Sequence, residues 1–193
     1  MRLKALLSLL AVALATAVLL LALLVGGAAG GHGKGKGHNN GSGSHGRIGY
    51  HFLVVDQIAG QSDRMIIQGD GSFNRNRASG GGTFDHFLAG TGPPATLIAT
   101  GTWKAEGVVS WTPGLTHGVY QGGILTIHAT VRPVGGPVIR NVTLEISCNL
   151  GPAGYNSGNP EGVVVTIPGG PTFIPTDPTT GVTVFSLTKG HKH

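Results

Sequence analysis

The 193-residue chain is poor in the residues that most soluble proteins use to carry charge and to cross-link the fold. Charged side chains make up 11% of it, aromatic ones make up 6%, and Cys148 is its single cysteine. Soluble domains usually contain about 25% charged residues. This shortage excludes a coiled coil and a charge-rich disordered protein, and one cysteine excludes an intramolecular disulfide. No convincing helical period runs through residues 48–188, which excludes an ordinary helical bundle.

The motifs of several enzyme classes are absent as well. The chain has no G-x-S-x-G, no Walker loop, no Rossmann fingerprint and no HExxH sequence. The eight acidic residues are scattered, mostly near predicted turns, and nothing selects two of them as a catalytic carboxylate pair. We therefore expect a non-catalytic protein rather than an enzyme.

Residues 1–30 have the parts of an export signal. Two basic side chains precede an uncharged, apolar run over 5–25, which is followed by small residues. This order is typical of a secretory signal peptide. The run of 21 residues is also long enough to span a bilayer, so a retained N-terminal membrane anchor is the alternative. In both cases we expect a secreted or extracytoplasmic protein, which contacts a membrane only through residues 5–25 if they are not cleaved.

Glycine is what the chain has in excess, with 35 residues beside 11 prolines. Residues 31–47 contain almost no apolar side chain and are predicted to be a flexible Gly/His/Lys arm, and 189–193 a short polar tail. Between them, 48–188 has the size of one domain. Its six basic and eight acidic side chains make it slightly acidic, so the pI near 9.7 comes from the ends. This distribution argues against nucleic acid as a partner.

Apolar and polar residues alternate most clearly in 124–131 and 141–148. Alternation with a period of two indicates strands with one buried face, and the Pro- and Gly-containing link between them indicates a turn. We predict a hairpin in which Ile127 lies opposite Val142. The alternation also places Cys148 on the apolar face, as a small core residue.

A triplet of glycine, a hydroxyl residue and an aromatic residue occurs three times, ending at Phe73, Phe84 and Trp103. Glycine weakens a strand unless a neighbour covers it, and an aromatic ring from the next strand can do so. The triplets therefore predict three adjacent antiparallel strands with these rings on one face.

Further strands are predicted at 48–55, 64–74, 80–87, 96–111, 161–167 and 181–187, with a break at Gly107 as the alternative for 96–111. Eight or nine short strands separated by Gly/Pro turns indicate an all-β domain. We expect a single antiparallel meander that closes into a small β-barrel of about eight strands, because closure leaves no long exposed edge. A β-sandwich is the alternative.

Three stretches carry a resemblance: GDGSFNRNRASGGGTFDHF (69–87), ATGTWKA (99–105) and NPEGVVVTIPGG (159–170). Together they resemble a group of small exported bacterial β-rich proteins of uncharacterised function. The resemblance covers most of 48–188. It implies export and a compact β domain, and it brings no activity, ligand or site residue with it.

The arm contains the first candidate site. His32, His38 and His45 lie in it, and flexible histidine-rich tracts can bind Cu(II) or Ni(II). Cleavage after Ala29 would start the mature chain at Gly30-Gly31-His32, whose amine, two amides and imidazole offer four nitrogens in a square plane. Any other first residue removes this motif. A solubilising linker without metal is the alternative.

The second candidate site is a ligand pocket in the barrel mouth, formed by His86, Trp103 and Tyr120. His86 shares a strand face with Phe84, whereas Asp85 faces the other way. Two functions follow from the sequence. The first is a non-catalytic module that binds a ligand, a cell-envelope component or a protein. The alternative is a small-molecule carrier or β-barrel enzyme with its site in the mouth. A filled core would favour the first, and a pocket the second.

Overall fold

The structure, a computed structural model, describes residues 47–58, 61, 63–88, 96–150, 156–175 and 181–187. These residues form nine strands and no helix. The strands are β1 (Ile48–Ile58), β2 (Arg64–Phe73), β3 (Ala78–Leu88), β4 (Thr96–His117), β5 (Tyr120–Pro133), β6 (Ile139–Cys148), β7 (Gly162–Thr166), β8 (Thr172–Pro175) and β9 (Val182–Leu187). The predicted export segment, arm and tail lie outside the described residues, and no helix able to cross a membrane occurs within them.

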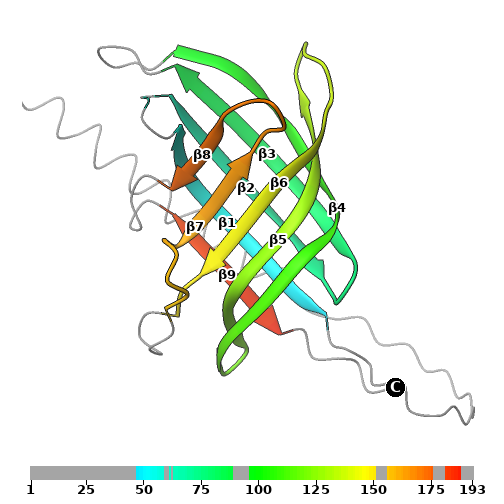
Figure 1. The fold of residues 1–193 in the computed structure, drawn as a ribbon, viewed down its shortest axis with the longest axis vertical. Coiled ribbons are helices and arrows are strands. Elements are labelled where there is room, and N and C mark those ends of the chain that lie inside the picture. Colours follow the sequence, from blue (N-terminus) through cyan, green and yellow to red (C-terminus); the bar gives the residue numbers. More distant parts are fainter. Residues whose placement is uncertain are drawn as a thin grey trace, which may run out of the picture. The chain divides into compact units, whose positions relative to one another are not determined.

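The strands form an antiparallel meander that closes on itself (Figure 1). Each strand from β1 to β7 pairs with the next one along the chain, and β8 pairs with β1 to close the ring. The prediction of an all-β fold with a closed barrel of eight strands is therefore confirmed, and the β-sandwich alternative is wrong. The structure adds a ninth strand, β9, to this ring of eight.

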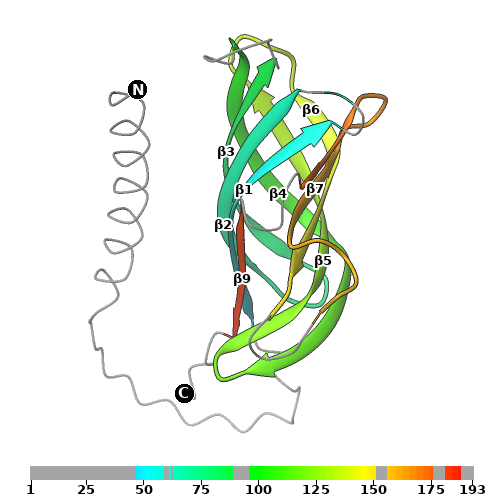
Figure 2. The ribbon, with the colours of Figure 1, turned by 90° about the vertical axis from the view of Figure 1, so that its left-hand side faces the viewer.

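The ninth strand completes the wall where β8 is too short to do so. β8 covers only Asp56–Ile58 of one edge of β1, and β9 pairs with Ile48–Leu53 of the same edge. Two short strands thus share one long neighbour, and Figure 2 shows β9 beside β1. On its other side β9 reaches the start of β5, where Tyr120 pairs with Ser186.

Side chains connect β9 to the end of β6. Thr183 donates from its hydroxyl to the Ser147 carbonyl oxygen at 2.7 Å. The Glu161 carboxylate accepts hydrogen bonds from the Thr183 amide and hydroxyl, and from the Asn149 amide, at 3.1–3.3 Å. Buried backbone donors need partners, and Glu161 supplies them in this gap.

The β5–β6 hairpin has the predicted faces but not the predicted register. Ile127 lies opposite Leu144, not Val142, which pairs with Ala129. Next to the turn, Val131 pairs with Ile139, one residue later than the predicted register gives, and a bulge in β6 adds one more residue. Asn141 occupies that bulge with φ of 57°, a left-handed conformation that asparagine tolerates better than most residues. The combined shift of two residues keeps every side chain on its predicted face.

The three aromatic triplets lie as predicted, on the adjacent antiparallel strands β2, β3 and β4. Phe73, Phe84 and Trp103 are all buried inside the barrel. A Cβ atom added to Gly69 would overlap the Trp103 ring, and one added to Gly101 would meet Phe84 at 2.7 Å. The rings therefore occupy the space that the glycines leave open, and the prediction of aromatic cover over glycine is confirmed.

Two strand predictions need correction. β8 was not predicted, because its four residues TFIP show almost no alternation and end at a proline. β4 is longer than predicted and continues through Gly107 to His117. It bends at bulges rather than breaking, with register shifts at Ala105/Gly107 and at two later points.

Cys148 should be inert to a bulky thiol reagent in the native protein. Its side chain is 2% exposed, as the alternation predicted, and its Sγ lies 3.3 Å from the Thr183 carbonyl oxygen. Burial raises the pKa of the thiol, so little thiolate forms near neutral pH. Ellman's reagent should label the urea-unfolded chain completely and the native chain only at the rate of unfolding. Rapid stoichiometric labelling of native protein would contradict this placement.

Candidate functional site: a cavity at one end of the barrel

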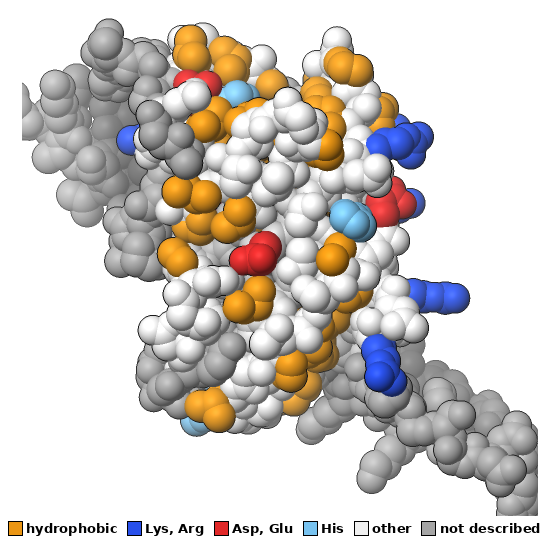
Figure 3. Space-filling model, in the orientation of Figure 1, with side chains coloured by type: hydrophobic (Ala, Val, Ile, Leu, Met, Phe, Trp, Pro, Cys, Tyr) orange, Lys and Arg blue, Asp and Glu red, His pale blue; other side chains and the backbone are white. Residues whose placement is uncertain are grey.

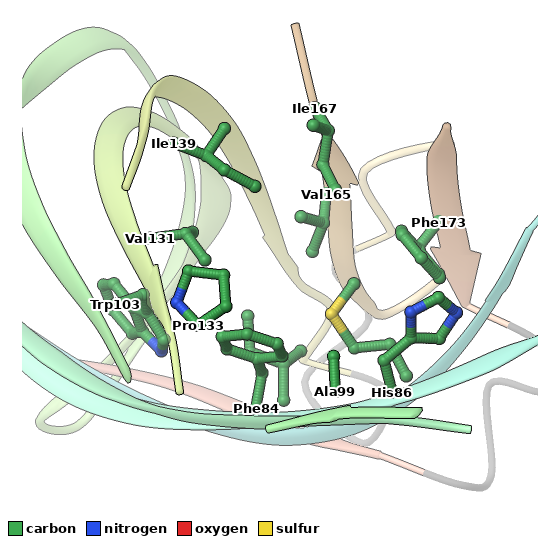
Figure 4. Close-up of a pocket in the computed structure, with 12 residues that line it drawn as sticks. Phe84, His86, Ala99, Trp103, Val131, Pro133, Ile139, Val165, Ile167 and Phe173 are labelled. Carbon is green, nitrogen blue, oxygen red and sulfur yellow. The ribbon is translucent and has the colours of Figure 1, made fainter. Parts of the chain in front are cut away.

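An apolar cavity of about 120 Å³ lies at the end of the barrel where β1 ends and β2 begins. Side chains from seven consecutive strands, β2 to β8, line it. In Figure 4, Phe84, Ala99 and His86 rise from one wall, and Ile139, Val165 and Phe173 face them from the other. The cavity exists because inward residues from many strands converge there without filling the space.

His86 is the only titratable residue in this lining. Its ring packs edge-on against Phe173, with centroids 5.2 Å apart and planes at 88°. Its Nε2 lies 3.4 Å from Asp63 Oδ2, close enough for an ion pair, but the alignment gives no hydrogen bond. Trp103 also lines the cavity, but its indole N–H is already bonded to the Gln68 carbonyl oxygen at 3.0 Å. His86 is therefore the polar side chain still able to bind.

Asp56 stands beside this cavity, inside the barrel. In β1 the inward positions are Tyr50, Phe52, Val54, Asp56 and Ile58. The register places Asp56 opposite Met65 of β2, and Met65 opposite His86 of β3. Asp56, Met65 and His86 thus form one inward row across three strands, and both Met65 and His86 line the cavity.

The Asp56 carboxyl is wholly buried and has no partner. Its exposed fraction is 0%, and neither oxygen makes a hydrogen bond. Burial disfavours the charged form, and this raises the pKa of Asp56 to about 8. The carboxyl is therefore mostly protonated at neutral pH in this structure.

The buried polar atoms without a partner are confined to this row. Within the described residues they are the two carboxyl oxygens of Asp56 and Nε2 of His86. Each such atom costs about 1–3 kcal/mol, and native proteins contain few of them. Their concentration on either side of Met65, next to a cavity, indicates a place where a polar group from outside the chain can bind.

The structure places the predicted pocket residues in two different regions. His86 and Trp103 both line the cavity. Tyr120 does not, because it begins β5 at the opposite end of the barrel, where it is 48% exposed beside Ser186. Asp56 and Met65 were not singled out from the sequence. One signal in the sequence could have identified Asp56. It occupies the same alternating positions as the apolar residues Tyr50, Phe52, Val54 and Ile58, which places an acidic side chain on the inward face of the strand.

The predicted Cu(II)/Ni(II) ligands His32, His38 and His45 lie outside the described residues, so that site stays a prediction. Within the part of the chain that the structure describes, no three His, Cys, Asp or Glu side chains are grouped to hold a metal ion.

Fold and site together define the class of protein: a closed antiparallel β-barrel with an apolar cavity at one end and an unpartnered carboxyl beside it. Comparison of the chain with protein families, curated proteins and solved structures found no match.

Proposed function

We propose that this protein is an exported binding protein or carrier that holds a small apolar molecule in the barrel-end cavity. The cavity itself is the observation that carries the proposal, because a module that acts only through its surface has no need of a hollow interior. Ligand sites in proteins are concave and mostly apolar, with a few placed polar groups, and this cavity has that character. Its single titratable side chain favours binding over catalysis.

The size of the cavity sets the size of the ligand. Its volume of about 120 Å³ is close to that of an engineered apolar cavity of ~150 Å³ that stays dry and binds benzene. A ligand of about six or seven carbon atoms would fill it. Moving that apolar surface out of water supplies the affinity.

Export is part of the same proposal and rests on residues 1–30, whose basic, apolar and small-residue segments follow one another as in a signal peptide. A carrier of this kind would act in a secreted or extracytoplasmic location. Its contact with a membrane would run only through residues 5–25, if they are retained. The slightly acidic net charge of the domain argues against nucleic acid as a partner.

Filling the cavity should abolish binding. We expect toluene to bind the full chain saturably, and Ala99→Leu to weaken binding at least tenfold because the larger side chain occupies the cavity. Binding can be followed by Trp103 fluorescence in a Trp111→Phe background, since these are the two tryptophans of the chain.

Ala78→Leu is the matched control, because Ala78 is also partly buried but lies at the start of β3, at the other end of the barrel. It should bind toluene like the parent protein. Equal weakening by both substitutions, or no binding by the parent, would contradict the proposal.

A further inference from the structure

We propose that the ligand is a small primary amine, whose carbon body fills the cavity and whose ammonium group binds between the Asp56 carboxyl and His86. This inference rests on the proposed function, and it assigns the polar end of the ligand. Neither the cavity volume nor the sequence motifs specify that end.

The row geometry brings the polar groups within reach of one ligand. Adjacent strands lie about 4.8 Å apart, so the backbones at Asp56 and His86 are roughly 10 Å apart, with Met65 between them. Asp56 is not part of the cavity lining, whereas its cross-strand neighbour Met65 is. Methionine has three rotatable bonds and adapts its shape readily. A small movement of Met65 would join the carboxyl to the cavity.

The charges at this end of the barrel favour a cation. The groups that face the row are the carboxyls of Asp56 and Asp63 and the His86 imidazole, with Asp63 3.4 Å from His86. Every lysine and arginine within the described residues is exposed, and Figure 3 shows such side chains projecting from the surface. Arg64, the nearest in sequence, is on the outward face of β2. The interior therefore holds the Asp56 carboxyl, and among the described residues no lysine or arginine side chain lies inside the barrel to neutralise it.

An ammonium group supplies what these atoms lack. It offers three hydrogen-bond donors and one positive charge, as a lysine side chain does. Asp56 can accept in its ionised form, and neutral His86 can accept at Nε2 if its proton is on the other nitrogen. A carboxylate ligand could form no charge pair with the carboxyl of Asp56 or Asp63, and an alcohol could hydrogen-bond to the protonated Asp56 carboxyl but would gain no charge pair.

Binding of the amine should release one proton. In the free protein the Asp56 carboxyl holds its proton at neutral pH, because burial raises its pKa to about 8. When an ammonium ion binds, the carboxyl O–H bond breaks, the proton passes to the buffer, and the carboxylate pairs with the bound cation. No other bond forms or breaks.

Three ligands with the same six-carbon chain test the inference: hexylamine, 1-hexanol and hexanoate, titrated calorimetrically into the full chain at pH 7. We expect hexylamine to bind at least tenfold more tightly than 1-hexanol, and hexanoate to bind most weakly. Titrations in phosphate and in Tris, which differ in ionisation enthalpy, should show close to one proton released per hexylamine.

Asp56→Asn should lower the affinity for hexylamine at least tenfold and abolish the proton release.

Asp85→Asn is the matched control. Asp85 is next to His86 in β3 but faces outward, so this variant loses the same charge without touching the row. It should bind hexylamine like the parent protein. Equal affinity for hexylamine and 1-hexanol, or an equal loss in both variants, would overturn the amine site while the cavity remains a binding site. Failure of all three ligands, and of toluene, would overturn the proposed function as well.

Discussion

Asp56→Asn should raise the free energy of unfolding by roughly 3–5 kcal/mol at pH 8 and change it little at pH 4. The pKa of Asp56 is about 8 in the folded protein, against an ordinary value near 3.8. Between these values the unfolded chain has released its proton while the folded protein still holds it. The folded state then binds more protons, so stability must fall as pH rises from about 4 to about 8. Asparagine has nearly the same shape as a protonated aspartic acid but does not titrate, so it removes this pH-dependent loss of stability.

Urea unfolding at pH 4, 6 and 8 measures the effect. The difference between Asp56→Asn and the parent protein should grow at each step, whereas Asp85→Asn should run parallel to the parent. Asp85 is a suitable reference because it lies next to His86 in β3 but its side chain faces outward, away from the row. A constant difference over this pH range would mean that the Asp56 carboxyl is solvated or paired in solution.

Trp103→Ala should destabilise the protein by about 3–5 kcal/mol, as truncation of a buried aromatic residue usually does. Trp103 is 3% exposed and stacks against Phe52 with ring centroids 5.6 Å apart. It also covers Gly69, where no side chain fits beneath the ring. Its loss therefore removes packing from three strands at once and enlarges the cavity that it lines.

Denaturant titration of a double-mutant cycle isolates the contact between ring and glycine. Gly69→Ala should be costly in the parent protein, because the new methyl group overlaps the Trp103 ring, and less costly once Trp103 is alanine. Trp111→Ala gives a reference, since Trp111 is only partly buried and should cost less. Additive effects of the Gly69 and Trp103 substitutions would show that the ring does not cover that glycine.

Most of the fold could be predicted because alternation and glycine–aromatic pairing are local signals. The faces of β5 and β6 and the burial of Cys148 follow from a period of two, which an error of two residues in register leaves intact. The bulge at Asn141 could not be predicted, because it depends on how two strands meet rather than on either sequence alone. The short strand β8 leaves too few residues for any period to appear.

The site was harder to predict, because it depends on which end of the barrel a residue reaches. His86 and Trp103 lie together since β3 and β4 are antiparallel neighbours, whereas Tyr120 begins β5 at the other end. Asp56 was not singled out because the eight acidic residues are scattered in the sequence and lie mostly near predicted turns. β1 in fact extends to Ile58, three residues beyond its predicted end, and this extension carries Asp56 into the barrel.

The NMR signal of one methionine tests most directly the claim that the barrel-end cavity binds a small amine. The chain has two methionines, Met1 in the predicted export segment and Met65 between Asp56 and His86 in the cavity wall. In protein labelled with ¹³C at the methionine methyl groups, the Met65 resonance should shift saturably as hexylamine is added, with the same affinity as in calorimetry. Without ligand it should titrate with a midpoint near pH 8, following Asp56. A Met65 resonance that hexylamine and toluene both leave in place at saturating calorimetric concentrations would contradict a binding site in the barrel.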